Sequence, residues 1–288
     1  MTMFKKLIEF FKRAFCKKKD EEITTQPTSG ASSIDVDSTE NTTPDENSES
    51  ASTSESASSE AVSVEKPETT ITPEPKPVES NIKILIDNGH GNNTAGKRSP
   101  WSANKTAPEI EFYEYKWNRE IANAIVGELK DKGYDAELIV TEEKDISLSE
   151  RANRVNAICK EHGKNKTILI SIHANAAGNG KEWMNARGWC AYTTVGETKS
   201  DKLAEFLYDE AEKNFVGMKI RKDNSDGDRD WESNFTVIYK SICPAVLTEN
   251  FFYDNVEDVR YILSDEGRKA VVKTHVDGII NYINSIEK

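Results

Sequence analysis

From residue 81 onward, short apolar runs alternate with longer amphipathic segments. The short runs are rich in β-branched residues and predict buried strands at 82–87, 135–141, 167–175, 188–194 and 245–252. The longer segments place apolar residues at helical spacing and predict helices at 114–133, 147–163, 199–215, 256–264 and 267–286. Strands that alternate with helices pair in parallel, because each helix returns the chain to the same end of the sheet. We therefore expect an α/β fold, a single three-layer domain whose mostly parallel central sheet is flanked by helices.

Local signals at the ends of two predicted helices agree with this assignment. Gly133 and Gly163 follow the last apolar positions of their helices, where a left-handed residue commonly ends a helix. Ser147 stands three residues before Glu150, which is the spacing of a capping box at a helix start. These signals place the first and second helices of the domain at 114–133 and 147–163.

Residues 20–80 have a composition that opposes folding. They consist mainly of Ser, Thr, Glu, Asp and Pro, and such a segment buries too little apolar surface to offset the loss of chain entropy. We interpret them as a disordered acidic linker, extended by like charges and by the run "PEPKP". The remaining residues, 81–288, are long enough for one hydrophobic core. The chain thus divides into 1–19, 20–80 and a globular domain at 81–288.

The net charge of the chain is −12, and the linker contributes most of it. The globular domain is left mildly acidic, whereas a nucleic-acid-binding domain presents a basic surface. We therefore expect no nucleic-acid partner. The oligomeric state stays open.

Residues 1–19, "MTMFKKLIEFFKRAFCKKK", have the pattern of a basic amphipathic helix. Glu9, Lys12 and Arg13 interrupt the apolar stretch that a secretory signal peptide needs, and the segment is too short and too charged to span a bilayer. Two interpretations stay open: a helix that contacts a membrane surface or a partner, and a solvated, frayed tail.

Four cysteines show no CxxC pair, and three of them lie in the domain. We interpret Cys159 and Cys243 as small core residues and expect no disulfide framework.

Polar residues that can carry chemistry stand at the ends of three predicted strands. His90 follows the strand 82–87, His173 lies near the end of 167–175, and Glu249 lies in 245–252. In open α/β sheets, ligands bind beyond the carboxyl ends of the strands, so the fold can gather these three residues at one edge. The other two histidines in the chain, His162 and His275, lie within helical patterns and are interpreted as structural.

Glu114 is the fourth candidate, because it shares a helix face with apolar positions. It precedes Trp117 by three residues and Ile121 by seven, so its carboxylate points toward the interior and needs a partner there. A metal ion and an arginine are both suitable partners. Three other glutamates near this helix start are alternatives, Glu109, Glu111 and Glu120.

Two histidines and one carboxylate, with a fourth position open, form the usual ligand set of a hydrolytic zinc site. Such an ion lowers the pKa of a bound water to about 7 and polarises a carbonyl under attack. A further carboxylate must then move the proton, and Glu249 could do so. From spacing alone, the alternatives of satisfied polar histidines and a salt-bridged Glu249 also stay open.

Several motifs in one order resemble a known family, the zinc-dependent N-acetylmuramoyl-L-alanine amidases of type 3. The motifs are "ILIDNGHG", "EYKWNREIANAI", "SLSERANRVN", "ILISIHANA" and "FTVIYKSICPAVLTENFF", and the resemblance spans about residues 82–286. It implies one zinc ion per domain with His90, Glu114 and His173 as ligands, and Glu249 as the catalytic residue. "DNGHG" and "TEN" depart from the commoner family sequences without removing any of these four residues.

The resemblance implies a peptidoglycan hydrolase that cleaves the amide between the lactyl group of N-acetylmuramic acid and L-alanine of the stem peptide. Two alternatives are a catalytically inactive peptidoglycan-binding module and a zinc hydrolase of another amide. The implied place of action is the cell wall, reached by phage-type release or from a membrane surface contacted by residues 1–19. Arg221 and Arg229, in the charged segment 219–234, are expected to be solvated loop charges rather than substrate contacts.

Overall fold

A computed structural model describes residues 80–287. The expected helix at 1–19 and the expected linker at 20–80, apart from residue 80, lie outside the described residues. The described part contains a six-stranded sheet in the order β2-β1-β3-β6-β4-β5. The strands are β1 (Lys83–Asn88), β2 (Ala136–Leu138), β3 (Thr167–Asn175), β4 (Cys190–Thr193), β5 (Trp231–Glu232) and β6 (Ala245–Phe252).

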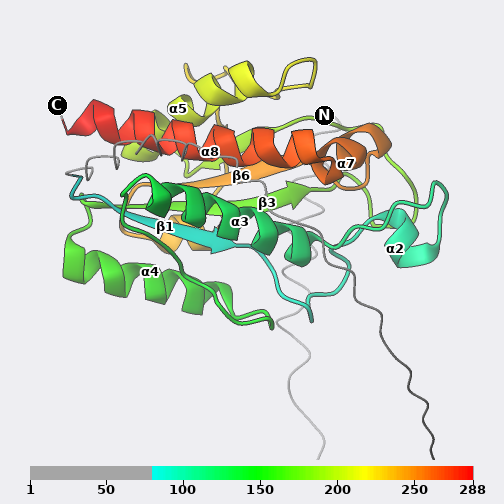
Figure 1. Cartoon of the computed structure of the whole chain (residues 1–288), viewed down its shortest axis with the longest axis horizontal. Helices are drawn as coiled ribbons and strands as arrows, with labels where there is room; N and C mark the ends of the chain where they lie inside the picture. Colours follow the sequence, from blue (N-terminus) through cyan, green and yellow to red (C-terminus); the bar gives the residue numbers. More distant parts are fainter. Residues whose placement is uncertain (1–79, 288) are drawn as a thin grey trace, which may run out of the picture. The chain divides into compact units, whose positions relative to one another are not determined.

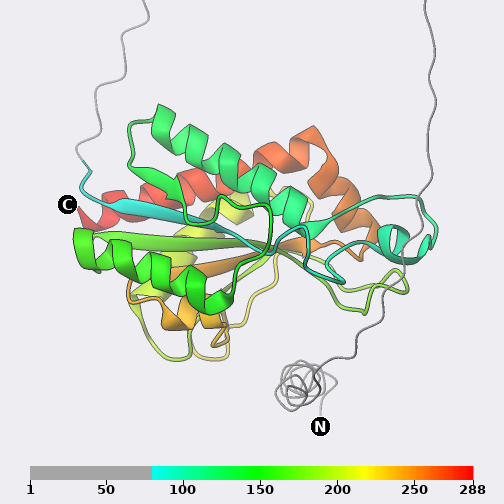
Figure 2. The ribbon, with the colours of Figure 1, turned by 90° about the horizontal axis from the view of Figure 1, so that it is seen from below.

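Helices cover both faces of this sheet, so the three-layer α/β prediction is confirmed (Figures 1 and 2). The helices are α2 (Pro100–Asn104), α3 (Glu114–Asp131), α4 (Leu148–His162), α5 (Lys199–Asn214), α6 (Thr236–Lys240), α7 (Val256–Leu263) and α8 (Asp265–Ile286). On one face α8 packs against α3 and α5, and on the other face α4 packs against α6. No helix within residues 80–287 is long and apolar enough to cross a membrane.

The central strands are buried on both faces, as their continuous apolar sequences predict. In β1, Ile84 and Ile86 belong to the core beneath α3, whereas Leu85 between them belongs to the smaller core beneath α4. This alternation follows from the two-residue period of a strand. The sheet therefore holds two hydrophobic cores apart and fixes both helical layers.

The strands β2, β1, β3 and β6 are parallel, but β4 runs antiparallel to β6, and β5 pairs in parallel with β4. The sheet is thus mixed, with its parallel part in the centre. The strands β3 and β6 have the predicted bounds, whereas β2 is much shorter than the predicted 135–141. It is an edge strand that pairs only with β1, so its sequence continues into a loop after a few ladder bonds.

The glycines predicted to end two helices have the expected conformation, whereas the capping box predicted at the start of α4 is only half formed. Gly133 and Gly163 have φ values of 87° and 98°, so both stand in the left-handed region where glycine is favoured. Ser147 caps α4 by accepting a hydrogen bond from the backbone N–H of Glu150, as expected, but the Glu150 carboxylate instead accepts from Arg154. The complete capping box stands at α5, where Thr198 and Asp201 bond reciprocally.

The cysteine prediction is confirmed for the described residues. Cys159, Cys190 and Cys243 are buried free thiols. Cys159 and Cys243 lie together in the core beneath α4.

Candidate metal centre

The sheet order brings three predicted site residues to one edge. The strands β1, β3 and β6 are neighbours and parallel, so their carboxyl ends meet. His90 comes directly after β1, and His173 on β3 is in register with Glu249 on β6. The prediction that chain-distant strand ends gather these side chains is therefore confirmed.

The backbone turns sharply at His90, which has a φ of 67°, in the left-handed region. Two buried or half-buried arginines hold this turn through the His90 carbonyl oxygen. It accepts hydrogen bonds from Arg119 Nη1 at 2.8 Å and from Arg151 Nη2 at 3.3 Å. These contacts offset the cost of a left-handed residue that is not glycine and fix where the imidazole points.

Arg151 is itself held by the end of β1. It is 1% exposed and donates to the Asp87 carboxylate and, at 2.9 Å, to the Asn88 carbonyl oxygen. It also donates to Asp145 at 2.7 Å. Because its guanidinium is buried and hydrogen-bonded to all of these groups, Arg151 fixes α4 to the turn that carries His90.

His173 lies directly against Gly89. A Cβ atom on Gly89 would stand 2.1 Å from His173 Cε1, so only glycine leaves room for this ring. The two imidazole rings of His90 and His173 are nearly perpendicular, with centroids 4.9 Å apart. The Asn250 side chain donates to the His173 carbonyl oxygen at 2.9 Å and fixes the strand end behind the ring.

Glu114 is the first residue of α3 and is 1% exposed. Its Oε1 lies 3.1 Å from His173 Nδ1 and 3.3 Å from His90 Nε2, and it accepts from the Ala174 N–H at 3.2 Å. The structure therefore brings Glu114 to both histidines. The three alternative glutamates are exposed, namely Glu109, Glu111 and Glu120.

These three residues can hold a metal ion. Each offers one ligand atom, and the three atoms lie within 4.8 Å of one another. Glu114 Oε2 is buried and has no hydrogen-bond partner in the described part of the chain, which fits an oxygen that binds a cation. Two imidazole nitrogens and a carboxylate oxygen are donors that zinc accepts readily.

The electrostatics of Glu114 favour its charged form. Burial alone would raise the pKa of this carboxyl, but His90, Lys97 and the hydrogen bond to His173 outweigh it and hold the pKa well below the usual value. An ionised carboxylate is the form that binds a cation.

Glu249 faces the same site from β6. Its side chain is partly exposed, and its Oε2 has no partner among the described residues. Burial of the carboxyl and the nearby negative charge of Glu114 raise the pKa of Glu249 to about 7, although His173 opposes the shift. A carboxyl with this pKa can exchange a proton near neutral pH.

The remaining histidines lie elsewhere. His275 is buried in α8, where its Nδ1 lies 2.7 Å from the Val271 carbonyl oxygen and its Nε2 lies 2.9 Å from Thr248 Oγ1. His162 is exposed at the end of α4. Neither lies among the metal-ligand candidates of residues 80–287.

The expectation of solvated loop charges is wrong for Arg221 and Arg229. The Arg221 guanidinium packs 5.1 Å from the ring centroids of both Trp231 and Phe252, and its charge acts on Glu249. Arg229 is paired with carboxylates of α5. The loop packs back onto the domain, so its charges find partners that its charged sequence does not reveal.

Sequence reasoning missed the groups that hold the site residues in place. Asn118 donates to the Gly89 carbonyl oxygen at 3.1 Å, one turn of α3 after Glu114. Arg119 and Asn250 act in the same way on His90 and His173. The one signal for Asn118 is its position on the buried face of α3, next to Trp117, where a polar side chain needs a partner.

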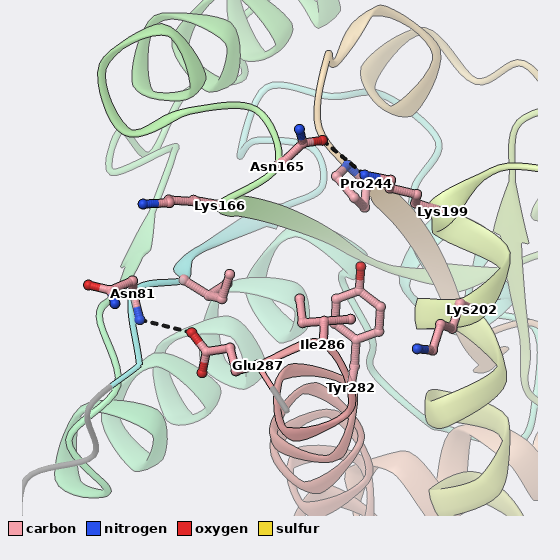
Figure 3. Close-up of a pocket in the computed structure, with 10 residues that line it drawn as sticks. Asn81, Asn165, Lys166, Lys199, Lys202, Pro244, Tyr282, Ile286 and Glu287 are labelled. Atoms are coloured by element: carbon pink, nitrogen blue, oxygen red, sulfur yellow. Dashed lines mark hydrogen bonds between the residues drawn. The ribbon is translucent and has the colours of Figure 1, made fainter.

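A cavity of about 540 Å³ lies away from this site (Figure 3). Its lining includes residues that precede β1, β3 and β6, so it opens at the amino ends of the parallel strands. Lys166, Lys199 and Lys202 stand around it. The cavity holds none of the four predicted site residues.

Residues 84–281 match the protein-family model described as N-acetylmuramoyl-L-alanine amidase. The endolysin of Bacillus phage SPP1 is 25% identical over 212 residues, covering 71% of this chain and 67% of the relative. The N-acetylmuramoyl-L-alanine amidase CwlM of Bacillus licheniformis is 27% identical over 206 residues, covering 70% and 69%.

Solved structures agree with the sequence relatives. The crystal structure of N-acetylmuramoyl-L-alanine amidase from Clostridium difficile 630 is 26% identical, with a TM-score of 0.57, and the match covers 72% of this chain and all of that one. The matched family model spans most of the described domain. The match includes the four predicted site residues, His90, Glu114, His173 and Glu249. The chain therefore belongs to the N-acetylmuramoyl-L-alanine amidase family.

Proposed function

We propose that the residues at the carboxyl ends of β1, β3 and β6 carry out the amidase reaction of this family on peptidoglycan. The bond cleaved is the amide between the lactyl group of N-acetylmuramic acid and L-alanine of the stem peptide. One observation carries the assignment of the site: Glu114 Oε1 lies within 3.3 Å of nitrogens of both His90 and His173. No ordinary core packing needs a buried carboxylate between two half-buried imidazoles.

His90, Glu114 and His173 would hold a zinc ion. When bound there, zinc activates a water molecule and polarises the amide carbonyl. The protein supplies the geometry, because the Arg119 and Arg151 contacts orient His90, and Gly89 admits the ring of His173. Both imidazoles are partly exposed, with side-chain exposures of 17% and 16%, so a substrate carbonyl can approach them from solvent.

Glu249 would move the proton. Standing in register with His173 and partly open to solvent, it can take a proton from the attacking water. It then donates that proton to the departing L-alanine nitrogen, which leaves as an amine. Its pKa of about 7 suits both halves of this exchange.

The experiment that tests this function is digestion of purified peptidoglycan by the full chain, with and without a chelator, followed by mass analysis. The expected result is chelator-sensitive release of intact stem peptides that begin with L-alanine, without new reducing sugar ends. New amino groups at another position would support a zinc hydrolase of another amide. Binding to peptidoglycan without any release, by protein carrying one zinc ion, would support an inactive binding module.

Glu249→Gln separates proton transfer from metal binding. The variant should retain one zinc ion per chain, because Glu249 is not among the three ligands, while turnover falls at least about 100-fold. Zinc content by elemental analysis and the rate of L-alanine exposure measure the two effects. Glu161→Gln, at an exposed position on α4, is the matched control and should keep both. A Glu249→Gln variant that turns over at the wild-type rate would refute the assignment.

The place of action follows from the substrate, which is the cell wall. We propose in addition that residues 1–19 contact a membrane surface through their basic amphipathic pattern. Deleting residues 1–19 should move the protein from the membrane fraction to the soluble fraction of broken cells. Unchanged partitioning would exclude this contact and leave phage-type release as the route to the wall.

A further inference from the structure

Three aspartates form a second group of carboxylates away from the amidase site. We call Asp201, Asp228 and Asp230 the acidic cluster. One oxygen of each lies within 4.8 Å of one oxygen of the others. Asp201 lies in the first turn of α5, whereas Asp228 and Asp230 lie in the loop before β5. The function proposed above uses none of them.

The acidic cluster contains two buried oxygens that have no hydrogen-bond partner among the described residues. Asp230 is 1% exposed, and its Oδ2 accepts a hydrogen bond of 2.6 Å from the Thr193 hydroxyl. Its Oδ1, and Oδ1 of Asp228, are buried without a hydrogen-bond partner in the described residues. A buried carboxylate oxygen left in this state costs free energy, and a bound cation removes that cost.

The charges around the acidic cluster are negative and favour binding of a cation. The charges that act most on Asp228 and Asp230 are all carboxylates. Arg229, which stands between them in sequence, turns away and pairs with Glu205 and Asp209 at 2.6 Å. Burial and the charges of Asp228 and Asp201 raise the pKa of Asp230 to about 7, although the hydrogen bond from Thr193 opposes the shift.

We propose that the acidic cluster is a binding site for a calcium ion. All the donors are oxygens, which favours hard cations such as calcium and disfavours zinc. The ligands come from a helix turn and an irregular loop, and calcium accepts irregular sets of six to eight oxygens, whereas magnesium demands a near-ideal octahedron. Water molecules would complete the shell.

The position of the site suggests what the ion does for the fold. Asp230 is fastened to β4 through Thr193, and Asp201 anchors the site to α5. The ion would therefore fasten the loop before β5 to two fixed elements. That loop begins near Arg221, whose guanidinium packs against Trp231 of β5 and Phe252 of β6, the strand of Glu249. Calcium would thus stabilise the loop that follows Arg221, whose charge acts on Glu249, without taking part in the reaction.

Calcium binding is tested on the full chain, zinc-loaded and prepared in calcium-free buffer. Adding calcium chloride to about 100 times the dissociation constant should raise the melting temperature by about 5 °C or more. Magnesium chloride at the same concentration should have a much smaller effect. Terbium, a luminescent substitute for calcium, should show emission sensitised by Trp231, the neighbour of Asp230 in sequence, and calcium should displace it.

Two variants locate the site. Asp230→Asn should bind calcium at least tenfold more weakly, and without calcium it should melt at or above the wild-type temperature, because one buried charge is gone. Asp228→Asn, at a less buried position, should show the same loss of affinity and serves if Asp230→Asn fails to fold. Asp226→Asn, an exposed aspartate of the same loop outside the acidic cluster, is the control and should bind within about twofold of wild type.

Three outcomes would overturn the proposal. The first is no saturable calcium binding and no rise in melting temperature in the wild type. The second is an equal response to magnesium, which would exclude calcium as the specific ligand. The third is an equal loss of affinity in Asp226→Asn and Asp228→Asn. Because none of these measurements uses peptidoglycan, their failure leaves the proposed amidase function untouched.

Discussion

At the scale of single residues, Gly89 decides how closely β1 can approach the ring of His173. Its φ is not in the left-handed region, so the requirement is one of space rather than of backbone conformation. A methyl group here would overlap the imidazole, and the ring would have to move away from Glu114. The site thus depends on the absence of a side chain as much as on the residues that carry chemistry.

We predict that Gly89→Ala loses metal and activity with little loss of fold. Zinc content and the rate on peptidoglycan should each fall at least about tenfold, because a displaced His173 loses its contact with Glu114. Gly127→Ala is the matched control, since a Cβ there meets nothing within 4 Å and Gly127 lies within α3. It should keep full activity and gain up to about 1 kcal/mol of stability. Wild-type zinc content in Gly89→Ala would contradict the steric argument.

The sequence predicts which residues come together at the candidate site where a simple geometric rule applies. His90, His173 and Glu249 follow from the meeting of parallel strand ends, and Glu114 follows from its helix face. The arginines that hold His90 could not be predicted in the same way. Their role depends on a left-handed turn at a histidine, and no local pattern in the sequence marks that turn.

At the scale of elements, α4 carries two arginines with opposite environments. Arg151 is buried and bonded to the end of β1, whereas the Arg154 side chain is 32% exposed and pairs with Glu142 and Glu150 on the surface. Burial decides how much each arginine contributes to the free energy of unfolding. Removing one partner of a buried pair leaves an uncompensated charge, whereas water replaces a partner at the surface.

We therefore predict that Arg151→Met lowers the free energy of unfolding by about 3–5 kcal/mol, because buried Asp87 loses its partner. Arg154→Met, on the same helix, should cost about 1 kcal/mol or less. Urea unfolding of both variants, with metal removed, measures the difference. Equal losses in the two variants would show that the link between α4 and β1 is not what stabilises this edge.

Elements were predictable in proportion to their length and burial. β3 and β6 lie in the centre of the sheet, and their long apolar runs fix both bounds. The short elements α2, α6 and β5 were missed, because a stretch of two to five residues shows no period. The bounds of β2 failed for a different reason, namely that an edge strand ends where its single neighbour stops pairing.

At the scale of the whole molecule, His275 joins the long helix α8 to the central strand β6. Its ring lies between the Val271 carbonyl oxygen and the Thr248 hydroxyl, one residue before Glu249. Burial lowers the pKa of His275 to about 4, so the folded protein holds this ring neutral. In the unfolded chain the same ring titrates near pH 6.5.

The sign of the pH effect follows from these two values. Between about pH 6.5 and pH 4 the unfolded state binds a proton that the folded state does not, so stability falls as the pH falls. The loss from this one residue should reach on the order of 3 kcal/mol near pH 4 and then level off. Urea unfolding of metal-free protein across this range measures it.

His275→Asn is the comparison, because its amide can still donate to Val271 and does not titrate. Its stability at pH 7 should be lower than that of the wild type, while its loss between pH 6.5 and pH 4 should be smaller by about the same 3 kcal/mol. Parallel pH profiles for the two proteins would show that His275 does not control acid stability.

The mixed direction of the sheet was the part of the whole fold that the sequence did not show. The order of strands and helices predicts parallel pairing, and the centre of the sheet follows that rule. β4 departs from it, because the chain connects β3 to β4 through a loop without a helix and starts β4 at the edge of the sheet where β3 ends. A connection without a helix has no hydrophobic period that would reveal it in the sequence.

The two ends of the described domain meet at one place. The Asn81 N–H and the Ser80 hydroxyl both donate to the Glu287 carboxylate, next to the cavity at the amino ends of the parallel strands (Figure 3). The residues of the candidate metal centre stand at the other ends of those strands. Both ends of the described domain therefore lie at the edge of the sheet opposite the candidate metal centre, so neither end covers that site.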